Sequence, residues 1–158
     1  MNFFEPGIPF TVAEIDSPGD FGHQRYRYIH PGLDIYVANG TLVKAIEPGI
    51  VVAITRFTGT HAEPPTPWWN NTWSVLVEGR SGVIGYCELI PADHIKIGVH
   101  ISLLTTIGSI IPVLMYDKGN GMTMLHLELY THGTIDHVNW EDDQPCPKQL
   151  LNPRIFLK

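Results

Sequence analysis

The chain has 158 residues, of which 44% are hydrophobic and 16% are charged, and its formal net charge is −6. This length and balance predict one folded domain over residues 1–158 with a real hydrophobic core, and they exclude a disordered chain. Because the sequence contains no basic cluster, we expect no nucleic-acid partner.

No stretch approaches the roughly 20 apolar residues of a membrane-spanning helix, so no membrane span is expected. The first seven residues carry neither a basic region nor a long apolar region, so they do not predict a secretory signal peptide. A place in the cell envelope or outside the cell would require a signal trimmed from the sequence given. Localisation and oligomeric state therefore stay open.

Fifteen glycines and thirteen prolines divide the chain into short runs rich in Val, Ile, Leu, Thr and Tyr, as is typical of strands between turns. No long helical period occurs. We predict a mostly β, single-domain antiparallel sheet with a barrel-sandwich-like core and long loops. The predicted strands lie near residues 33–38, 42–46, 50–56, 73–78, 83–89, 107–115 and 123–130.

Residues 58–71 hold three prolines and two tryptophans, so they predict a loop. Trp68 and Trp69 either line a binding groove or cover the edge of the core. The C-terminal segment, residues 144–158, is bounded by prolines and has an apolar end, so we expect it to pack against the sheet.

The two cysteines, Cys87 and Cys146, either pair as one disulfide or remain free thiols, because sequence cannot show whether they are close. Neither belongs to a C-x-x-C pair, so a cysteine-based zinc site is not expected.

Eight histidines are many for this length, and neutral imidazole is the commonest metal ligand in proteins. The first notable pattern is His30-Pro-Gly-Leu-Asp34. The even offset places both side chains on one face of an extended segment, and the Pro-Gly step can turn them toward a common point. Leu33, Ile35 and Val37 share the opposite face, which we expect to be buried.

In a second pattern, over residues 124–130, every second residue is a leucine. Its three leucines form an apolar face for the core, and the other face carries, in order, Met124, His126, Glu128 and Tyr130. The functional interpretation places His126 and Glu128 in a site, and the alternative is an amphipathic strand with a surface histidine.

A third pattern is Tyr86-Cys-Glu-Leu89, where alternation predicts Tyr86 and Glu88 on one face with Cys87 and Leu89 behind them. The alternative for Glu88 is a solvated carboxylate. The segment His132-Gly-Thr-Ile-Asp136-His137 repeats the His-x-x-x-Asp spacing, but it follows a strand directly and is typical of a turn, so no metal role is expected there.

Together these patterns resemble the lysostaphin/LytM-type zinc metalloendopeptidases, which cut peptide bonds of peptidoglycan. The signature H-x-G-x-D of that family corresponds to residues 30–34, and its signature H-x-H-x-E corresponds to residues 124–128. Further segments, Tyr86-Cys-Glu-Leu89 and residues 95–108, match in order and spacing, so the resemblance covers about residues 20–155.

The resemblance implies a lysostaphin-type fold, a zinc cofactor and a peptidoglycan or peptide substrate. Carried over residue by residue, it makes His30, Asp34 and His126 the zinc ligands. Two histidines, one carboxylate and an open fourth position are typical of a catalytic zinc site. Tyr86, Met124 and Trp69 are the expected substrate-contacting residues.

The sequence departs from the family at two helper histidines, whose positions hold Glu88 and Met124. Methionine can neither transfer a proton nor donate a hydrogen bond to an oxyanion. A glutamate beside a zinc site is a workable general base, so Glu88 is the expected catalytic residue.

Three hypotheses follow. The first is a zinc-dependent metallopeptidase acting on peptidoglycan, with Glu88 as the general base. The alternative is a zinc-binding, non-catalytic module of the same fold that binds peptide, glycan or a protein partner. A metal-free carrier domain is the third, but neither Lys44 nor Lys96 has the exposed hairpin-tip setting that a prosthetic group requires.

Overall fold

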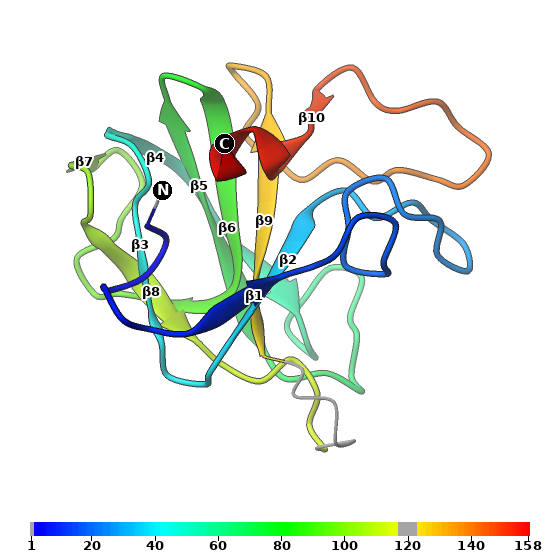
Figure 1. Cartoon of the computed structure of the whole chain (residues 1–158), viewed down its shortest axis with the longest axis horizontal. Coiled ribbons are helices and arrows are strands. Elements are labelled where there is room, and N and C mark those ends of the chain that lie inside the picture. The colour runs from blue at the N-terminus through cyan, green and yellow to red at the C-terminus, as the bar shows by residue number, and fades with distance from the viewer. Residues whose placement is uncertain (1, 117–122) are drawn as a thin grey trace.

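The computed structural model describes residues 2–116 and 123–158. Over these residues the chain is mostly β, as predicted, with antiparallel pairing throughout and no α-helix (Figure 1). The described part contains no helix able to span a membrane. The strands are β1 (Phe10–Val12), β2 (Leu33–Val37), β3 (Leu42–Lys44), β4 (Gly49–Thr58), β5 (Thr72–Gly79), β6 (Gly82–Pro91), β7 (His100–Ile101), β8 (Thr106–Ile110), β9 (Met124–Tyr130) and β10 (Leu150–Leu151), and the 3₁₀ helix η1 (Pro153–Leu157) follows them.

One sheet joins the strands in the order β1-β2-β9-β6-β5-β4-β7. The short strand β10 pairs with β9, and β8 pairs with both β3 and β6. In Figure 1, β6 and β9 stand at the centre of the molecule, although about 30 residues separate them in the chain. The centre of the sheet is therefore built from two distant segments.

All seven predicted strands occur, with shifted ends. The largest difference is at residues 107–115, where β8 ends at Ile110, shortly before Pro112, which has no N–H to donate to a ladder. The unpredicted strands β1, β7 and β10 have three, two and two residues, too few for a period to be visible.

The C-terminal segment packs against the sheet, as expected from its apolar end. Leu150 and Leu151 pair with β9, and Phe156 of η1 is 3% exposed in the main core. Arg154 donates through Nε to the Asp20 carboxylate at 2.6 Å and through Nη2 to the Ala13 carbonyl at 2.6 Å. The end of the chain thereby anchors the loop that precedes β2.

Alternation in β2 and β9 puts one face of the sheet into the core, as predicted. Leu33, Ile35 and Val37 of β2 are at most 6% exposed, and the three leucines of β9 are completely buried. Because side chains of a strand alternate between faces, the polar residues of both strands are turned to the other side. The face with Asp34 and His126 is thus opposite the main core.

The alternation predicted for β6 is wrong at Glu88, which is a β-bulge. On β5, Trp73 pairs with Leu89 and Ser74 pairs with Cys87, so Glu88 has no partner there. Its φ of 67° is in the left-handed region, which costs a non-glycine residue about 1 kcal/mol or more. The extra residue puts Tyr86 and Leu89 into the core and turns Cys87 and Glu88 away from it.

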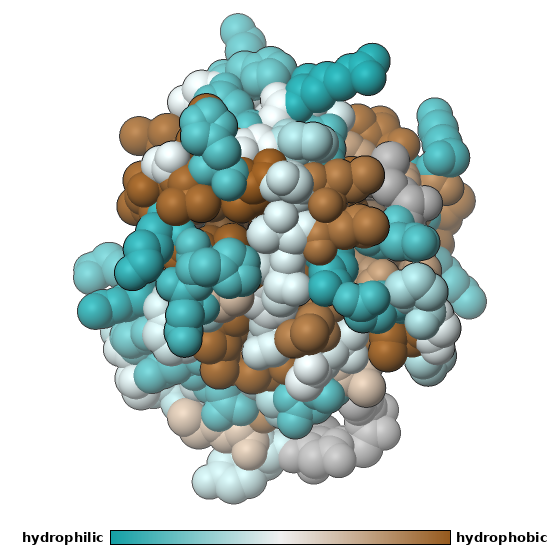
Figure 2. Space-filling view, turned by 90° about the vertical axis from the view of Figure 1, so that its left-hand side faces the viewer, coloured by the Kyte–Doolittle hydropathy of each residue, from teal (hydrophilic) through white to brown (hydrophobic). Residues whose placement is uncertain are grey.

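Apolar side chains are also exposed on the side of the molecule that carries β7 and β3, as Figure 2 shows. Leu103 and Leu104 lie in the turn between β7 and β8 and are 55% and 53% exposed. The long connections leave the sheet on the other side in Figure 1.

The core contribution of β9 can be measured by unfolding. Leu127→Ala removes a completely buried side chain, so we expect the free energy of unfolding to fall by about 3 kcal/mol. The matched change Leu103→Ala, at an exposed leucine, should cost less than about 0.5 kcal/mol. Equal losses in urea denaturation of the two variants would contradict this placement of the core.

Candidate functional site

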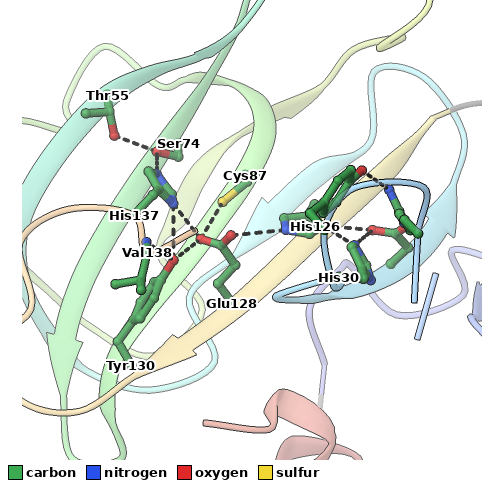
Figure 3. Close-up of polar contacts among 12 residues, drawn as sticks. His30, Thr55, Ser74, Cys87, His126, Glu128, Tyr130, His137 and Val138 are labelled. Carbon is green, nitrogen blue, oxygen red and sulfur yellow. Dashed lines mark hydrogen bonds and ion pairs between the residues drawn. The ribbon is translucent and has the colours of Figure 1, made fainter. Parts of the chain in front are cut away.

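A row of polar side chains crosses the sheet on the face opposite the main core. Antiparallel pairing places Asp34 of β2 opposite His126 of β9, which in turn lies opposite Cys87 of β6. The row continues from Cys87 to Ser74 of β5 and then to Thr55 of β4. Residues directly opposite in adjacent strands point to the same side, so the register alone gathers these five groups. Figure 3 shows four of them by name.

His30, Asp34 and His126 converge at one end of this row. His126 Nδ1 lies 2.8 Å from Asp34 Oδ1 and 3.1 Å from His30 Nε2, and the His30 Nε2 to Asp34 Oδ1 distance is 3.4 Å. The three residues are 2–7% exposed. The structure therefore brings together the three predicted ligands, which the chain separates by up to 96 residues.

The orientation of the His30 ring follows from its second nitrogen. Nδ1 lies 2.9 Å from the carbonyl oxygen of Asp20, which can only accept a hydrogen bond. Nδ1 must carry the proton, so Nε2 presents its lone pair toward Asp34 and His126. The Asp20 carboxylate accepts from the backbone N–H groups of Asp16 and Phe21 and from Arg154, which fixes this loop.

The His126 ring is oriented in the same way by a carboxylate. Nε2 donates to Glu128 Oε1 at 3.2 Å, which leaves Nδ1 toward Asp34 and His30. Burial alone lowers the pKa of His126, but hydrogen bonds and charges from Asp34 and Glu128 raise it to about 10. A metal ion at Nδ1 would replace that proton, because a ligating imidazole is neutral.

Asp34 is held as an anion. Burial raises its pKa, but the nearby His126 and His30 rings, 2.8 and 3.4 Å from Oδ1, outweigh burial and lower that pKa well below the usual range. Arg25 donates to the second oxygen, Oδ2, at 3.3 Å and also to the Pro18 carbonyl. This arrangement leaves Oδ1 directed at the two histidines.

These three donors fit a zinc ion. Tetrahedral bonds of about 2.0–2.1 Å place neighbouring ligand atoms about 3.3 Å apart, and the observed separations are 2.8–3.4 Å. Both histidines have an outer partner on the opposite ring nitrogen, as metal-ligating histidines usually do. Donor type, spacing and ring orientation therefore agree with one another.

Glu88 is a buried carboxylate on the same side of the sheet. It is 7% exposed, and burial raises its pKa to about 7, although the charge of His126 and a hydrogen bond from Thr72 act in the opposite direction. The Thr72 hydroxyl donates to Oε2 at 2.9 Å, and the Thr58 hydroxyl lies 2.7 Å from that of Thr72. The alternative of a solvated carboxylate does not fit this burial.

Glu128 is the centre of a second polar cluster, next to the first (Figure 3). Its Oε2 accepts from Tyr130 at 2.7 Å and from His137 Nδ1 at 2.5 Å, while Oε1 accepts from His126. Burial raises the pKa of Glu128, but the positive charges and hydrogen bonds of His137 and His126 lower it well below the usual range. Glu128 thus connects the two histidines.

In the segment that repeats the His-x-x-x-Asp spacing, the side chains do not converge on one point. The His132 side chain is 63% exposed and lies 3.3 Å from Glu78, and Asp136 is exposed. His137 instead folds back onto Glu128, with its Nε2 2.6 Å from the Ser74 hydroxyl. The sequence does not predict that His137 contacts Glu128, because the loop that carries His137 has no periodic pattern.

An open cleft of about 560 Å³ lies over the predicted ligands. It is lined by all three of them and by Glu88, Met124 and Trp69. Tyr86 is not part of it: this side chain is completely buried in the main core, and its hydroxyl accepts from the Ile46 N–H at 3.1 Å. The expected substrate contact of Tyr86 is therefore wrong, because the bulge at Glu88 reverses its face.

Loops distant in sequence close the sides of this cleft. Arg25 and Arg27 come from the loop before β2, Phe57 from the end of β4, and Trp140 from the loop after β9. The Phe57 ring lies 5.8 Å from the His126 ring, centre to centre. The sequence did not predict Arg25 or Thr72, since no local pattern marks them, and it gave the segment with His137 no role.

Cys87 and Cys146 are free thiols. Cys87 is completely buried, on the cleft side of the sheet rather than behind Glu88 as alternation predicted, while Cys146 is exposed.

Comparisons with known proteins support the fold. No family model and no curated protein matches this sequence. A solved structure from Pseudomonas aeruginosa, provisionally assigned to the M23 peptidases, matches with a TM-score of 0.52 at 18% identity. The match covers 98% of this chain and 50% of the Pseudomonas chain, so this chain spans about half the length of the Pseudomonas protein. Csd3 of Helicobacter pylori matches over 84% of this chain and 36% or 34% of its own in two crystal forms, with TM-scores of 0.48 and 18% identity.

At such identity the Pseudomonas match concerns the fold alone. The predicted antiparallel β fold is confirmed, and it is shared with a protein assigned to the M23 peptidases.

Gly32 provides a test of the metal site. A Cβ atom there would lie 2.6 Å from His126 Nε2 and 2.7 Å from the Leu127 carbonyl oxygen, so Gly32→Ala must displace the His126 ring. We expect zinc affinity to fall about tenfold or more in a chelator-competition titration. Gly133→Ala is the control: its φ is 82° and no atom lies within 4 Å, so it should cost about 1 kcal/mol of stability and leave zinc affinity unchanged. Unchanged zinc affinity in Gly32→Ala would argue against His126 as a ligand.

The burial of Glu88 predicts a pH dependence of stability in protein treated with a chelator. In the folded state Glu88 keeps its proton up to about pH 7, whereas in the unfolded state it loses the proton near pH 4.5. The free energy of unfolding should therefore fall as the pH rises from 4.5 to about 7, by up to about 3 kcal/mol. Glu88→Gln should remove this loss, so the variant should be as stable as wild type at pH 4 and more stable at pH 8. Glu14→Gln, at an exposed side chain, should behave like wild type in the same denaturation series. A parallel pH profile for wild type and Glu88→Gln would refute the assignment.

Proposed function

We propose that this chain is a zinc-dependent metallopeptidase-like hydrolase acting on peptide bonds of peptidoglycan. The observation that carries the proposal is the convergence of ligand atoms from His30, Asp34 and His126, beside the buried Glu88 in an open cleft. The shared fold supports a peptidase-like function, and the resemblance of the sequence motifs supports peptidoglycan as the substrate.

His30, Asp34 and His126 would hold the zinc ion through Nε2, Oδ1 and Nδ1. A zinc ion with three protein ligands supplies a Lewis acid that polarises a carbonyl group and lowers the pKa of water to about 7. Asp20 and Glu128 would keep the two rings in the ligating tautomers through their contacts with the outer nitrogens.

Glu88 is proposed as the general base. A general base works best when its pKa lies near the operating pH, and burial raises the pKa of Glu88 to about 7. The Thr72 hydroxyl holds one carboxylate oxygen at 2.9 Å, so the other oxygen can receive a proton from water in the cleft. The protonated side chain can then donate that proton to the departing amine.

Met124 and Trp69 are proposed to contact the substrate. Met124 precedes His126 by two residues on β9 and lies on the same face of the strand, and Trp69 comes from the loop between β4 and β5. Both offer apolar surface, which suits the aliphatic parts of a peptide. The Arg25 side chain is 30% exposed beside Asp34, and it adds positive charge to this end of the cleft.

A second candidate is a zinc-binding module that does not cut. The observation in its favour is Met124, which lines the cleft where the related enzymes have a histidine that assists the reaction. Methionine offers no proton to a developing oxyanion, and losing one such donor typically costs about 10²–10³ in rate. The cleft would then bind peptide, glycan or a protein partner.

Hydrolysis assays on purified peptidoglycan and short Gly/Ala peptides test the proposal. The zinc-loaded protein should release new amino groups, a chelator should abolish this activity, and zinc should restore it. Glu88→Gln should lower kcat at least 100-fold while zinc content stays unchanged. The same change at exposed Glu14 should leave kcat as in wild type.

Two results separate the candidates. Binding of peptide or peptidoglycan by the zinc-loaded protein without any turnover would favour the non-catalytic module. If Glu88→Gln still turns over substrate, Glu88 is not the general base, and only the metal site of the proposal stands.

A further inference from the structure

A second group of metal-ligating atoms lies beside the first, on the same face of the sheet. One ligand atom from each of Cys87, Glu128 and His137 lies within 4.8 Å of the other two. Cys87 Sγ is 3.8 Å and His137 Nδ1 is 2.5 Å from Glu128 Oε2. We propose that Cys87, Glu128 and His137 form a second metal site, which takes zinc or another borderline-soft divalent ion such as cobalt.

The three residues come from three separate parts of the fold. Cys87 belongs to β6, Glu128 to β9, and His137 to the loop that follows β9 (Figure 3). Gly85 of β6 lies opposite Glu128, and a Cβ atom there would lie 3.3 Å from Oε2 and 3.6 Å from Sγ. The absence of a side chain at Gly85 therefore leaves room beside the cluster.

The donor set selects the class of ion. A thiolate, an imidazole and a carboxylate suit zinc and cobalt, whereas magnesium and calcium prefer oxygen ligands alone. Metal binding would place a Cys87 thiolate beside the Glu128 carboxylate, so two negative charges would meet at residues that are 0% and 2% exposed. A divalent ion carries the two positive charges that offset them.

The hydrogen bonds around His137 accommodate the exchange of a proton for a metal ion. His137 Nε2 lies 2.6 Å from Ser74 Oγ, which lies 2.7 Å from Thr55 Oγ1. Each hydroxyl can donate or accept, so the Nε2–H group of His137 can donate a hydrogen bond to Ser74 while Nδ1 releases its proton to solvent and binds the metal. The Cys87 thiol releases its proton to solvent when the metal–sulfur bond forms.

Glu128 would connect the two sites through one carboxylate. Oε1 accepts from His126 Nε2 at 3.2 Å, and Oε2 is the oxygen directed at Cys87 and His137. The second ion therefore uses no atom that the first site needs. Its binding does not depend on the proposed hydrolase activity.

The experiment counts metal ions in the full chain. Protein stripped with a chelator, incubated with excess zinc and desalted should hold two zinc ions by mass spectrometry of the metal. Cys87→Ser and His137→Gln should each hold one. Cys146→Ser, the matched change at the exposed cysteine, should hold two. His30→Ala should hold one, since it removes a ligand of the first site alone.

Cobalt loading identifies the thiolate without relying on a buried substitution. The chain has two cysteines, so a near-ultraviolet cobalt–thiolate charge-transfer band that persists in Cys146→Ser must come from Cys87. The band should also persist in His30→Ala. One zinc ion per wild-type chain that is lost in His30→Ala, two zinc ions in Cys87→Ser, or no thiolate band in Cys146→Ser would each overturn the second site. A single ion that remains in His30→Ala would instead leave the second site standing and argue against the first.

Discussion

The pairing of β2 with β9 is the constraint on which the rest of the site depends. It sets Asp34 opposite His126 across 92 residues of chain, and the β9–β6 pairing then adds Cys87 to the same row. A slip of one residue would turn His126 into the core and a leucine into the cleft, because strand side chains alternate between faces. The buried leucines of β9 therefore hold the proposed metal ligands in register as well as stabilising the core.

Burying so many ionisable groups on one face is costly, and the structure compensates for the cost with pairing. Asp34 and Glu128 are each less than 5% exposed, and each carboxylate accepts hydrogen bonds from histidine. No buried side-chain nitrogen or oxygen atom of the described residues lacks a hydrogen-bond partner. An environment of this kind fixes ring tautomers and charge, which is what a metal site requires of its surroundings.

Two features give this site its own chemistry. A bulge in β6 turns Glu88 into the cleft at the cost of a left-handed backbone conformation, and strained residues of this kind concentrate at functional sites. Met124, in contrast, offers an apolar surface next to the ligands. The proton chemistry would thus rest on Glu88, with no second histidine from β9 to share it.

The sequence by itself determined the strands that carry a clear period and the two faces of β2 and β9, because a period of two fixes which side chains share a face. The resemblance of the motifs pointed to the three proposed ligands, whose side chains the structure brings together. Only the tertiary structure decided that Tyr86 is in the core, that Cys87 faces the site, and that His137 returns to Glu128. A bulge shifts the period and a loop has none, so their consequences depend on strand pairing and packing between residues far apart in the chain.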